Sequence, residues 1–250
     1  MYYCCGITTK GVMPHNEDAL LINKTVINDG TIETTLSAPF MAAVSDGVSS
    51  ELSGEIASKL CMKFLCNLKV SHKMNLQNSI MKIHERLKKY GATKNNASNM
   101  QATLCAFAID DKNKIHTVNV GDSRLYRYKN SSLDQLSKDQ SLVQMLFEEG
   151  AITAEERKTH VHKNIIFPVM GNKDSKPKVD IKYLDMEIEH GDLFILCTDG
   201  LTDYLSNSEI EEMLSLPLNL NKRLSKLVHT ALAKGSTDNI TIVAVCNMSK

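Results

Sequence analysis

The sequence has 250 residues, a length that fits one large domain or two small ones and allows a sizeable hydrophobic core. Its 29 Lys and Arg balance its 29 Asp and Glu, so it has no basic field to attract nucleic acid or an anionic membrane. Apolar runs stay below the roughly 18 residues of a membrane span, and MYYCCGITTK at the start lacks the pattern of a signal peptide. We expect a cytoplasmic protein with no nucleic-acid or membrane partner.

The first 45 residues favour β-strands. Tyr2–Thr9 and residues 19–28 are rich in β-forming residues, and NDG at 28–30 is typical of a hairpin turn. Residues 31–44 are then expected to return as a strand.

Two helices are expected next. The first begins near Ser50, and its apolar stripe consists of Ile56, Leu60 and Phe64 with Ala57, Cys61 and Leu65 beside them. The second covers NLQNSIMKIHERLKKYG, with an apolar face of Leu76, Ile80, Ile83 and Leu87 and with Gly91 as its stop. His84 lies beside that face, and we interpret it as a packed or partly exposed residue rather than a ligand.

β-patterns return after residue 101. Residues 102–110 and 114–120 flank DKN, which predicts a hairpin, and SRLYRY at 123–128 predicts a third strand. DQSLVQMLFEEG then predicts a short helix, and Thr153 with Glu156 forms a capping-box pattern. Residues 158–180 are polar and irregular, which indicates an excursion over the surface.

The last quarter adds two strands, two helices and a final strand. Residues 181–188 and 192–198 predict strands, and a helix is expected from Ser208 with Glu211 as its capping partner. A further helix ends at Gly235, and NITIVAV predicts the last strand. Many adjacent strands joined by hairpins favour antiparallel sheets with helices outside, rather than a doubly wound parallel sheet.

Acidic residues stand at the ends of several predicted strands. Asp46 follows FMAAVS and Asp199 follows LFILCT, and each is followed by glycine. The other acidic residues in such settings are Glu17, Asp18, Asp122, Asp203 and Asp238. If these ends meet on one rim, the carboxylates repel one another unless cations neutralise them. Hard oxygen ligands suit Mg²⁺ or Mn²⁺, and Gly47 leaves its carbonyl open to a metal. For any single aspartate, a turn or helix-cap role is the alternative.

Several segments in this order resemble the motifs of one enzyme family. They are NEDA at 16–19, VSDGVSSELSGEIAS at 44–58, QATL at 101–104, VGDSRLY at 120–126, DQSLVQ at 139–144, LCTDGLTDYL at 196–205 and GSTDNITIV at 235–243. The family is the metal-dependent protein phosphatases of type 2C, the PPM family, and the chain is most similar to its compact bacterial members. The resemblance covers essentially the whole chain.

The resemblance implies a fold, a domain organisation and an activity. We expect a single α+β domain over residues 1–250, built as a four-layer α-β-β-α sandwich of two antiparallel sheets flanked by helices. Residues 145–180 correspond to the flap beside the active site. The implied activity is a protein serine/threonine phosphatase that acts on a phosphorylated protein and opposes a cognate kinase. We expect it to be a monomer.

The resemblance also implies a binuclear Mn²⁺ or Mg²⁺ centre, whose bound water attacks the phosphoryl group without a Ser or Cys nucleophile. Asp46 would bridge the two metals, the Gly47 carbonyl would bind one, and Asp199 and Asp238 would hold the other. Glu17 and Asp18 would act partly through metal-bound water. Asp122 and Asp203, with Asp199, match the residues that hold a third metal in bacterial members. Asn239 would shape the loop of Asp238.

The sequence departs from the family pattern where the substrate phosphate is bound. The usual arginine, three residues before the Asn of NED, is Met13 here, and methionine cannot make the charged bidentate contact. Lys10 and His15 are the nearby candidates to replace it. Val48 stands where some eukaryotic members have a histidine assigned as general acid.

Met13 supports an alternative of another class, a catalytically weak phosphatase-like module that binds a phosphoprotein or a regulatory partner. A third possibility is a phosphatase dedicated to one regulator.

Overall fold

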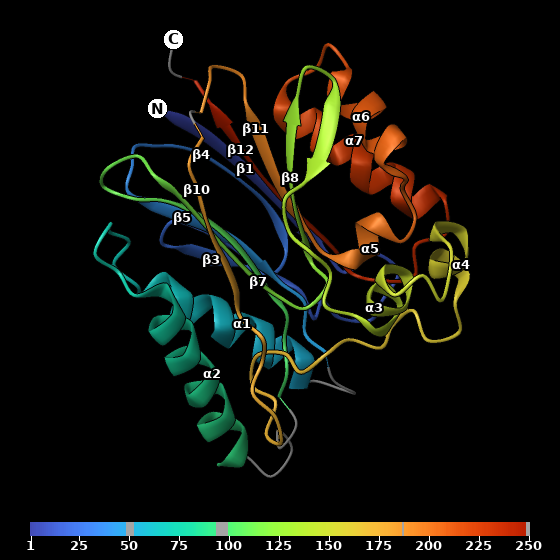
Figure 1. The fold of residues 1–250 in the computed structure, drawn as a ribbon. Coiled ribbons are helices and arrows are strands. Elements are labelled where there is room, and N and C mark those ends of the chain that lie inside the picture. Colours follow the sequence, from blue (N-terminus) through green and yellow to red (C-terminus); the bar gives the residue numbers. More distant parts are fainter. Residues whose placement is uncertain (49–52, 94–99, 187, 249–250) are drawn as a thin grey trace.

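The computed structural model describes residues 1–48, 53–93, 100–186 and 188–248, which form two six-stranded sheets lying face to face (Figure 1). In spatial order the first sheet consists of β4 (Gly30–Leu36), β1 (Tyr2–Thr9), β12 (Ile240–Asn247), β11 (Leu193–Cys197), β8 (Arg124–Lys129) and β9 (Ser132–Gln135). The second consists of β10 (Asp180–Leu184), β7 (Ile115–Val120), β6 (Leu104–Ile109), β5 (Phe40–Ser45), β2 (Ala19–Ile22) and β3 (Thr25–Ile27). Neighbouring strands run antiparallel, as the sequence predicts.

A pair of helices covers the outer face of each sheet (Figure 1). The pair α1 (Ser53–Cys66) and α2 (Leu76–Ala92) lies on the second sheet, and the pair α6 (Asn207–Ser215) and α7 (Leu220–Ala233) lies on the first. The described residues also form three short helices: α3 (Leu142–Glu148), α4 (Ala154–Thr159) and α5 (Asp199–Thr202). The succession helix, sheet, sheet, helix confirms the predicted four-layer sandwich.

Each boundary between layers is a hydrophobic core, and the strands supply both of their faces to it. In β2, Leu20 and Ile22 face the core between the sheets, whereas Ala19 and Leu21 face the core under α1. Because both faces are covered, such strands are unbroken apolar runs in the sequence rather than alternating ones. Truncating one of these buried residues, such as Leu20, to alanine is expected to cost roughly 2–5 kcal/mol.

The helices form where periodicity and caps predict them. The predicted apolar face of α2 is buried, and the Asn75 side chain caps its first turn by accepting from Asn78 N–H at 2.9 Å. The helix continues through Gly91 to Ala92, so Gly91 is not its stop. The capping box of Thr153 and Glu156 at α4 is confirmed.

The start of one other helix differs from the prediction. In α6 the capping box is Ser206 with Glu209, two residues before the predicted pair. Glu211 instead accepts a hydrogen bond from the backbone N–H of Leu133 at 2.8 Å. The start predicted near Ser50 lies outside the described residues. In α1, Ile56 is 37% exposed, whereas Ala57, Cys61 and Leu65 of the predicted stripe are buried in the core and Leu60 and Phe64 pack against it.

The predicted hairpin at Asn28–Gly30 is wrong. β3 pairs with β2 in the second sheet, whereas β4 pairs with β1 in the first, so this turn carries the chain from one sheet to the other. The Asn-Asp-Gly sequence predicts a sharp bend, but it does not determine which strand the following segment pairs with. It therefore occurs in hairpins and in such crossovers alike. Residues 19–28 instead bend at Asn23, which has a φ of 54°, and residues 31–44 divide into β4 and β5.

The prediction that residues 158–180 only cross the surface is also wrong in part. Val169 and Met170 are buried in the core under α1 and α2, and Met170 exchanges backbone hydrogen bonds of 3.0 Å with Ala102. These two apolar residues sit within a polar segment, so a composition average hides them. In the described residues, no helix is both long and apolar enough to cross a membrane.

Candidate metal centre

Strands of both sheets begin or end at one rim of the sandwich, and the acidic residues singled out in the sequence lie there. Asp46 directly follows β5, and Asp18 precedes β2, whose first residue pairs with the last residue of β5. Asp199 follows β11, whose last residue pairs with residues of β8 and β12. Asp122 precedes β8 and Asp238 precedes β12. Antiparallel pairing therefore brings these side chains together from distant parts of the sequence.

The carboxylates at this rim perturb one another. Burial raises the pKa of the Asp46 carboxyl well above its usual range, and the charge of Asp199 adds to the effect. The pKa of Asp199 is raised in the same way, by burial and then by Asp122. Burial also raises the pKa of Asp18 to about 7, against the hydrogen bond that the Thr198 hydroxyl donates to it at 2.8 Å. A cluster with raised pKa values of this kind attracts cations.

The donor chemistry fits a divalent cation that prefers oxygen. Carboxylates and backbone carbonyls are the ligands of Mg²⁺ and Mn²⁺, whereas zinc sites are rich in Cys and His. Among the described residues, no three His, Cys, Asp or Glu side chains already converge tightly enough to hold an ion. The fit to a divalent cation therefore rests on charge and donor type.

Asp46 and Asp199 are each followed by a glycine, and another backbone segment lies close against each glycine. A Cβ on Gly47 would overlap the backbone of Gly54 at the start of α1, and a Cβ on Gly200 would overlap the carbonyl of Asn239. The close approach ties Asp46 to α1 and ties Asp199 to the residue after Asp238. The Asp-Gly pairs thus reflect packing between segments rather than tight turns.

Threonine and asparagine side chains hold the acidic residues in place. The Thr103 hydroxyl accepts from the backbone N–H of Asp46 at 2.9 Å, and the Thr103 N–H donates to the Asp46 carbonyl at 2.8 Å. The Asn239 amide accepts from the N–H of Glu17 at 2.7 Å and donates to the carbonyls of Lys10 and His15 at 3.1 Å. The loop before β2 is therefore fastened to the start of β12.

A known family has this fold. The sequence pattern described as Protein phosphatase 2C matches residues 23–238, which include Asp46, Asp122, Asp199 and Asp238. The chain belongs to the protein phosphatase 2C family. The family, the fold class and the enzyme class predicted from the sequence are confirmed.

Similar proteins align with nearly the whole length of this phosphatase. The serine/threonine phosphatase stp of Listeria monocytogenes is 30% identical over 92% of this chain and 90% of its own length. The crystal structure of Stp1 from Staphylococcus aureus is 27% identical, covers 100% of this chain and 96% of its own, and has a TM-score of 0.82. PstP/Ppp of Mycobacterium tuberculosis is 25% identical over 100% of both chains, with a TM-score of 0.82. Another structure holds the PstP catalytic domain in complex with two manganese ions.

The loop of residues 10–15 brings the candidate phosphate-binding residues of the phosphatase to the protein surface. Met13 is 39% exposed. The Nε2 of His15 lies 3.3 Å from the Oε1 of Glu17, so this imidazole faces a carboxylate of the cluster. Lys10 is exposed, and its carbonyl takes part in the contact with Asn239. The use of Lys10 or His15 for a phosphate stays a prediction.

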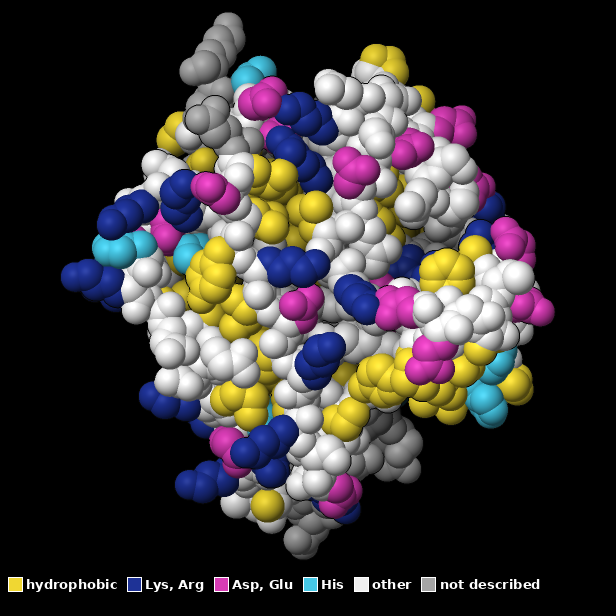
Figure 2. Space-filling view, in the orientation of Figure 1, with side chains coloured by type: hydrophobic (Ala, Val, Ile, Leu, Met, Phe, Trp, Pro, Cys, Tyr) yellow, Lys and Arg dark blue, Asp and Glu magenta, His cyan; other side chains and the backbone are white. Residues whose placement is uncertain are grey.

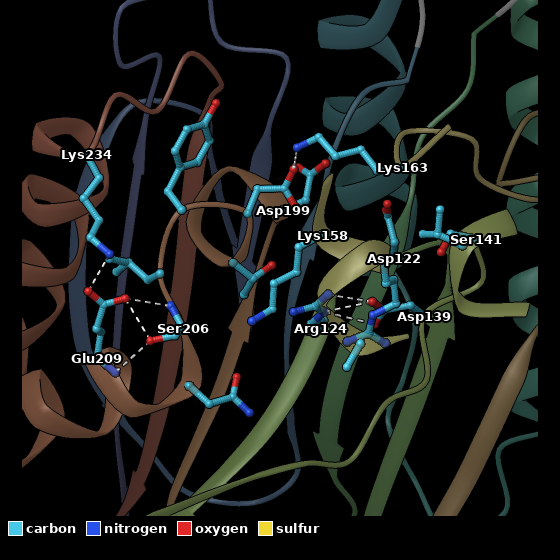
Figure 3. Close-up of a pocket in the computed structure, with 18 of the residues that line it drawn as sticks. Asp122, Arg124, Asp139, Ser141, Lys158, Lys163, Asp199, Ser206, Glu209 and Lys234 are labelled. Carbon is cyan, nitrogen blue, oxygen red and sulfur yellow. Dashed lines mark hydrogen bonds and ion pairs between the residues drawn. The ribbon is translucent and has the colours of Figure 1, made fainter. Parts of the chain in front are cut away.

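A pocket of about 660 Å³ opens beside the acidic rim of the phosphatase (Figure 3). Asp122, Asp199 and Asp203 line one end of it. Lys163, which the sequence gave no reason to select, places its Nζ 2.6 Å from the Oδ2 of Asp203. The guanidinium of Arg124 lies 2.7–3.0 Å from the carboxylate oxygens of Asp139 in the same wall.

Proposed function

We propose that this phosphatase hydrolyses phosphoserine and phosphothreonine in proteins, with two divalent cations, Mn²⁺ or Mg²⁺, bound at the acidic rim. The observation that carries the proposal is the gathering of carboxylates with raised pKa values where the two sheets meet. The two manganese ions of the PstP catalytic domain support the same reading. Asp46, the Gly47 carbonyl, Asp199 and Asp238 would hold the two ions.

The remaining acidic residues would act around these ions. Glu17 and Asp18 would bind through water, and Asp122 and Asp203 would hold a third ion together with Asp199. Bound divalent cations supply positive charge that makes water easier to deprotonate and that neutralises a phosphoryl group. The role of the protein's own residues is to hold the negatively charged side chains at fixed positions. Thr103 and Asn239 do this through the backbone of Asp46 and of the loop before Asp18.

Side chains near the rim do not favour a covalent intermediate. The Ser45 hydroxyl is buried and donates to the Thr103 carbonyl at 2.6 Å, so it is already engaged in a hydrogen bond. Burial raises the pKa of the Cys197 thiol to about 12, which leaves hardly any thiolate at neutral pH. Both observations support direct attack by water.

The biological setting is proposed in the same terms. The substrate would be a phosphorylated protein, and the opposing enzyme would be a serine/threonine kinase of the same cytoplasm. The balanced charge of the chain supports this setting, because it gives no field for nucleic acid or an anionic membrane. We also propose that the phosphatase works as a monomer, which light scattering of the purified chain tests directly.

The experiment measures hydrolysis of a small aryl phosphate and of a phosphothreonine peptide with Mn²⁺. EDTA and the Asp46→Asn variant should each abolish turnover. The matched control is Asp134→Asn, which changes an exposed aspartate of β9 away from the rim and should leave turnover as it is.

The result also decides the second candidate, a weak phosphatase-like binding module, which Met13 favours. That candidate predicts no turnover although calorimetry detects bound Mn²⁺. Recovery of turnover in Met13→Arg would then assign the defect to phosphate binding.

A further inference from the structure

The pocket beside the acidic rim has a second, basic wall. It extends from Asp122, Asp199 and Asp203 to the residues before α6 and along one side of α4. Its basic lining residues are Arg124, Arg157, Lys158, Lys163 and Lys234. Figure 3 shows Lys158 lying across the middle of the pocket, between the pair formed by Arg124 and Asp139 and the segment that carries Ser206 and Glu209.

Three of the five basic residues are already paired with a carboxylate. Arg124 holds Asp139, and Lys163 holds Asp203. Lys234 forms an ion pair with Glu209 at the far end of the pocket. Each of these three charges is balanced by a neighbouring carboxylate, so together they exert little net electrostatic field on a ligand in the pocket.

The two cations of α4 are different. Arg157 donates to the amide oxygen of Gln144 and lies 5.0 Å from the ring centroid of Phe147, and neither neighbour carries a charge. Lys158 is exposed, and no described residue forms an ion pair or hydrogen bond with it. The capping box at Thr153 and the contacts of Arg157 fix α4, so Lys158 is presented from an ordered element.

The net charge of the pocket depends on whether divalent cations are bound at the acidic rim. As the chain stands, the lining carries five basic residues against five acidic ones: Asp122, Asp139, Asp199, Asp203 and Glu209. Divalent cations at the rim would compensate the acidic end. The charges of Arg157 and Lys158 then stay unbalanced within the pocket, and a phosphorylated peptide entering the pocket would meet them.

We infer that Lys158, with Arg157 beside it, is a specificity-determining residue that binds a carboxylate side chain of the protein substrate near the phosphorylated residue. The inference rests on the proposed function, because it assumes that the phosphoryl group is bound at the rim. The pocket volume, about 660 Å³, lies within the range of roughly 300–1,000 Å³ typical of ligand sites, so it has room for residues beside the phosphorylated one.

Recognition by this residue is local rather than a property of the whole surface. On the face shown in Figure 2, Lys and Arg side chains alternate with Asp and Glu. The net charge of the chain is zero, so there is no long-range attraction of acidic proteins in general. The preference should therefore depend on where the acidic residue lies relative to the phosphorylated one.

The test compares phosphothreonine peptides that differ only in carrying Glu or Gln at the positions two to four residues on either side. At low salt we expect kcat/KM to be about three- to fivefold higher for the Glu peptide, the upper range of an exposed charge pair. The ratio should approach one in Lys158→Gln, return in Lys158→Arg and invert in Lys158→Glu. About 1 M salt should also remove it, because the screening length is then near 3 Å.

The control variant is Lys226→Gln, which removes an exposed charge of α7 away from the pocket and should keep the wild-type ratio. Turnover of a small aryl phosphate, which has no flanking residues, should be the same in all variants. A ratio of one in the wild type, or a ratio that Lys158→Gln leaves unchanged, would overturn the inference while aryl phosphate turnover continues. Loss of aryl phosphate turnover in the wild type would instead contradict the proposed function itself.

Discussion

Asp18→Asn should stabilise the metal-free phosphatase while impairing the metal-loaded one. Asp18 is buried beside like charges, and its pKa is raised from 3.8 to about 7 by burial first and then by the neighbouring Asp238 and Glu17. An ionised carboxylate at this position is therefore unfavourable without a cation. Asparagine has nearly the same shape and no charge to bury.

The size of the effect follows from the two pKa values. The interval between 3.8 and about 7 corresponds to roughly 4 kcal/mol at a pH above both. The new amide group needs a hydrogen-bond acceptor, and leaving it unsatisfied costs about 1–3 kcal/mol. A net gain of about 2 kcal/mol remains, which raises Tm by roughly 4–8 °C for a chain of this length.

The sign of the pH dependence is fixed by the raised pKa. Between pH 7 and pH 4 the folded protein holds a proton on Asp18 that the unfolded chain has lost. The free energy of unfolding of the wild type therefore rises as the pH falls through this window. The advantage of Asp18→Asn should be largest at pH 8, shrink toward pH 5 and give way at pH 4 to a deficit of about 1–3 kcal/mol, the cost of the unsatisfied amide.

The assay is thermal unfolding of wild type and variant in EDTA at these three pH values. Comparing the two proteins at each pH removes the contribution of the other titrating groups. A variant that is destabilised equally at pH 8 and pH 4 would show that Asp18 contributes through packing rather than through its charge.

Three further predictions address the rim. Gly200→Ala should lower stability by about 1–3 kcal/mol or more in denaturant unfolding, since its Cβ would overlap the Asn239 carbonyl, and a neutral effect would show that the two backbones are not in contact. Thr103→Val should lower the free energy of unfolding by about 1–3 kcal/mol and reduce kcat/KM, because it leaves the Asp46 N–H without its acceptor. Thr103→Ser keeps a hydroxyl and should recover most of the stability and of kcat/KM. Equal losses in the two variants would count against a role for this hydrogen bond. Apparent Mn²⁺ affinity in calorimetry should rise from pH 6 to pH 8, with proton release on binding, because carboxylates with raised pKa values, among them Asp18 with a pKa of about 7, must ionise first. A pH-independent affinity would mean that the ion binds elsewhere.

The sequence predicts the elements of the fold well where the signal is local. The apolar face of α2 and the capping box of α4 depend on residues three or four apart, so both could be read directly. The partner of a strand depends on residues far away in the chain, which is why the turn at Asn28–Gly30 was misassigned. The cap of α6 was predicted wrongly for another reason. Ser206 with Glu209 and Ser208 with Glu211 have the same spacing, and Glu211 is engaged by β9 instead.

The acidic residues of the site and Asn239 were singled out in the sequence, whereas the threonines that support them were not. An aspartate at the end of an apolar run, followed by glycine, stands out in the sequence. Thr103 and Thr198 are ordinary strand and loop residues by composition, and only the antiparallel register brings their hydroxyls to Asp46 and Asp18. Lys158 likewise lies in a charged helix, where nothing separates a pocket residue from a solvated one.

The acidic rim is proposed to bind the two divalent cations that hydrolysis of phosphoserine and phosphothreonine requires. The most direct measurement is the crystal structure of the phosphatase with Mn²⁺, with anomalous difference maps collected at the manganese edge. Two peaks are expected at the rim, both in contact with Asp46. Crystals of protein that hydrolyses the phosphothreonine peptide with Mn²⁺, yet show no peak at the rim, would contradict it.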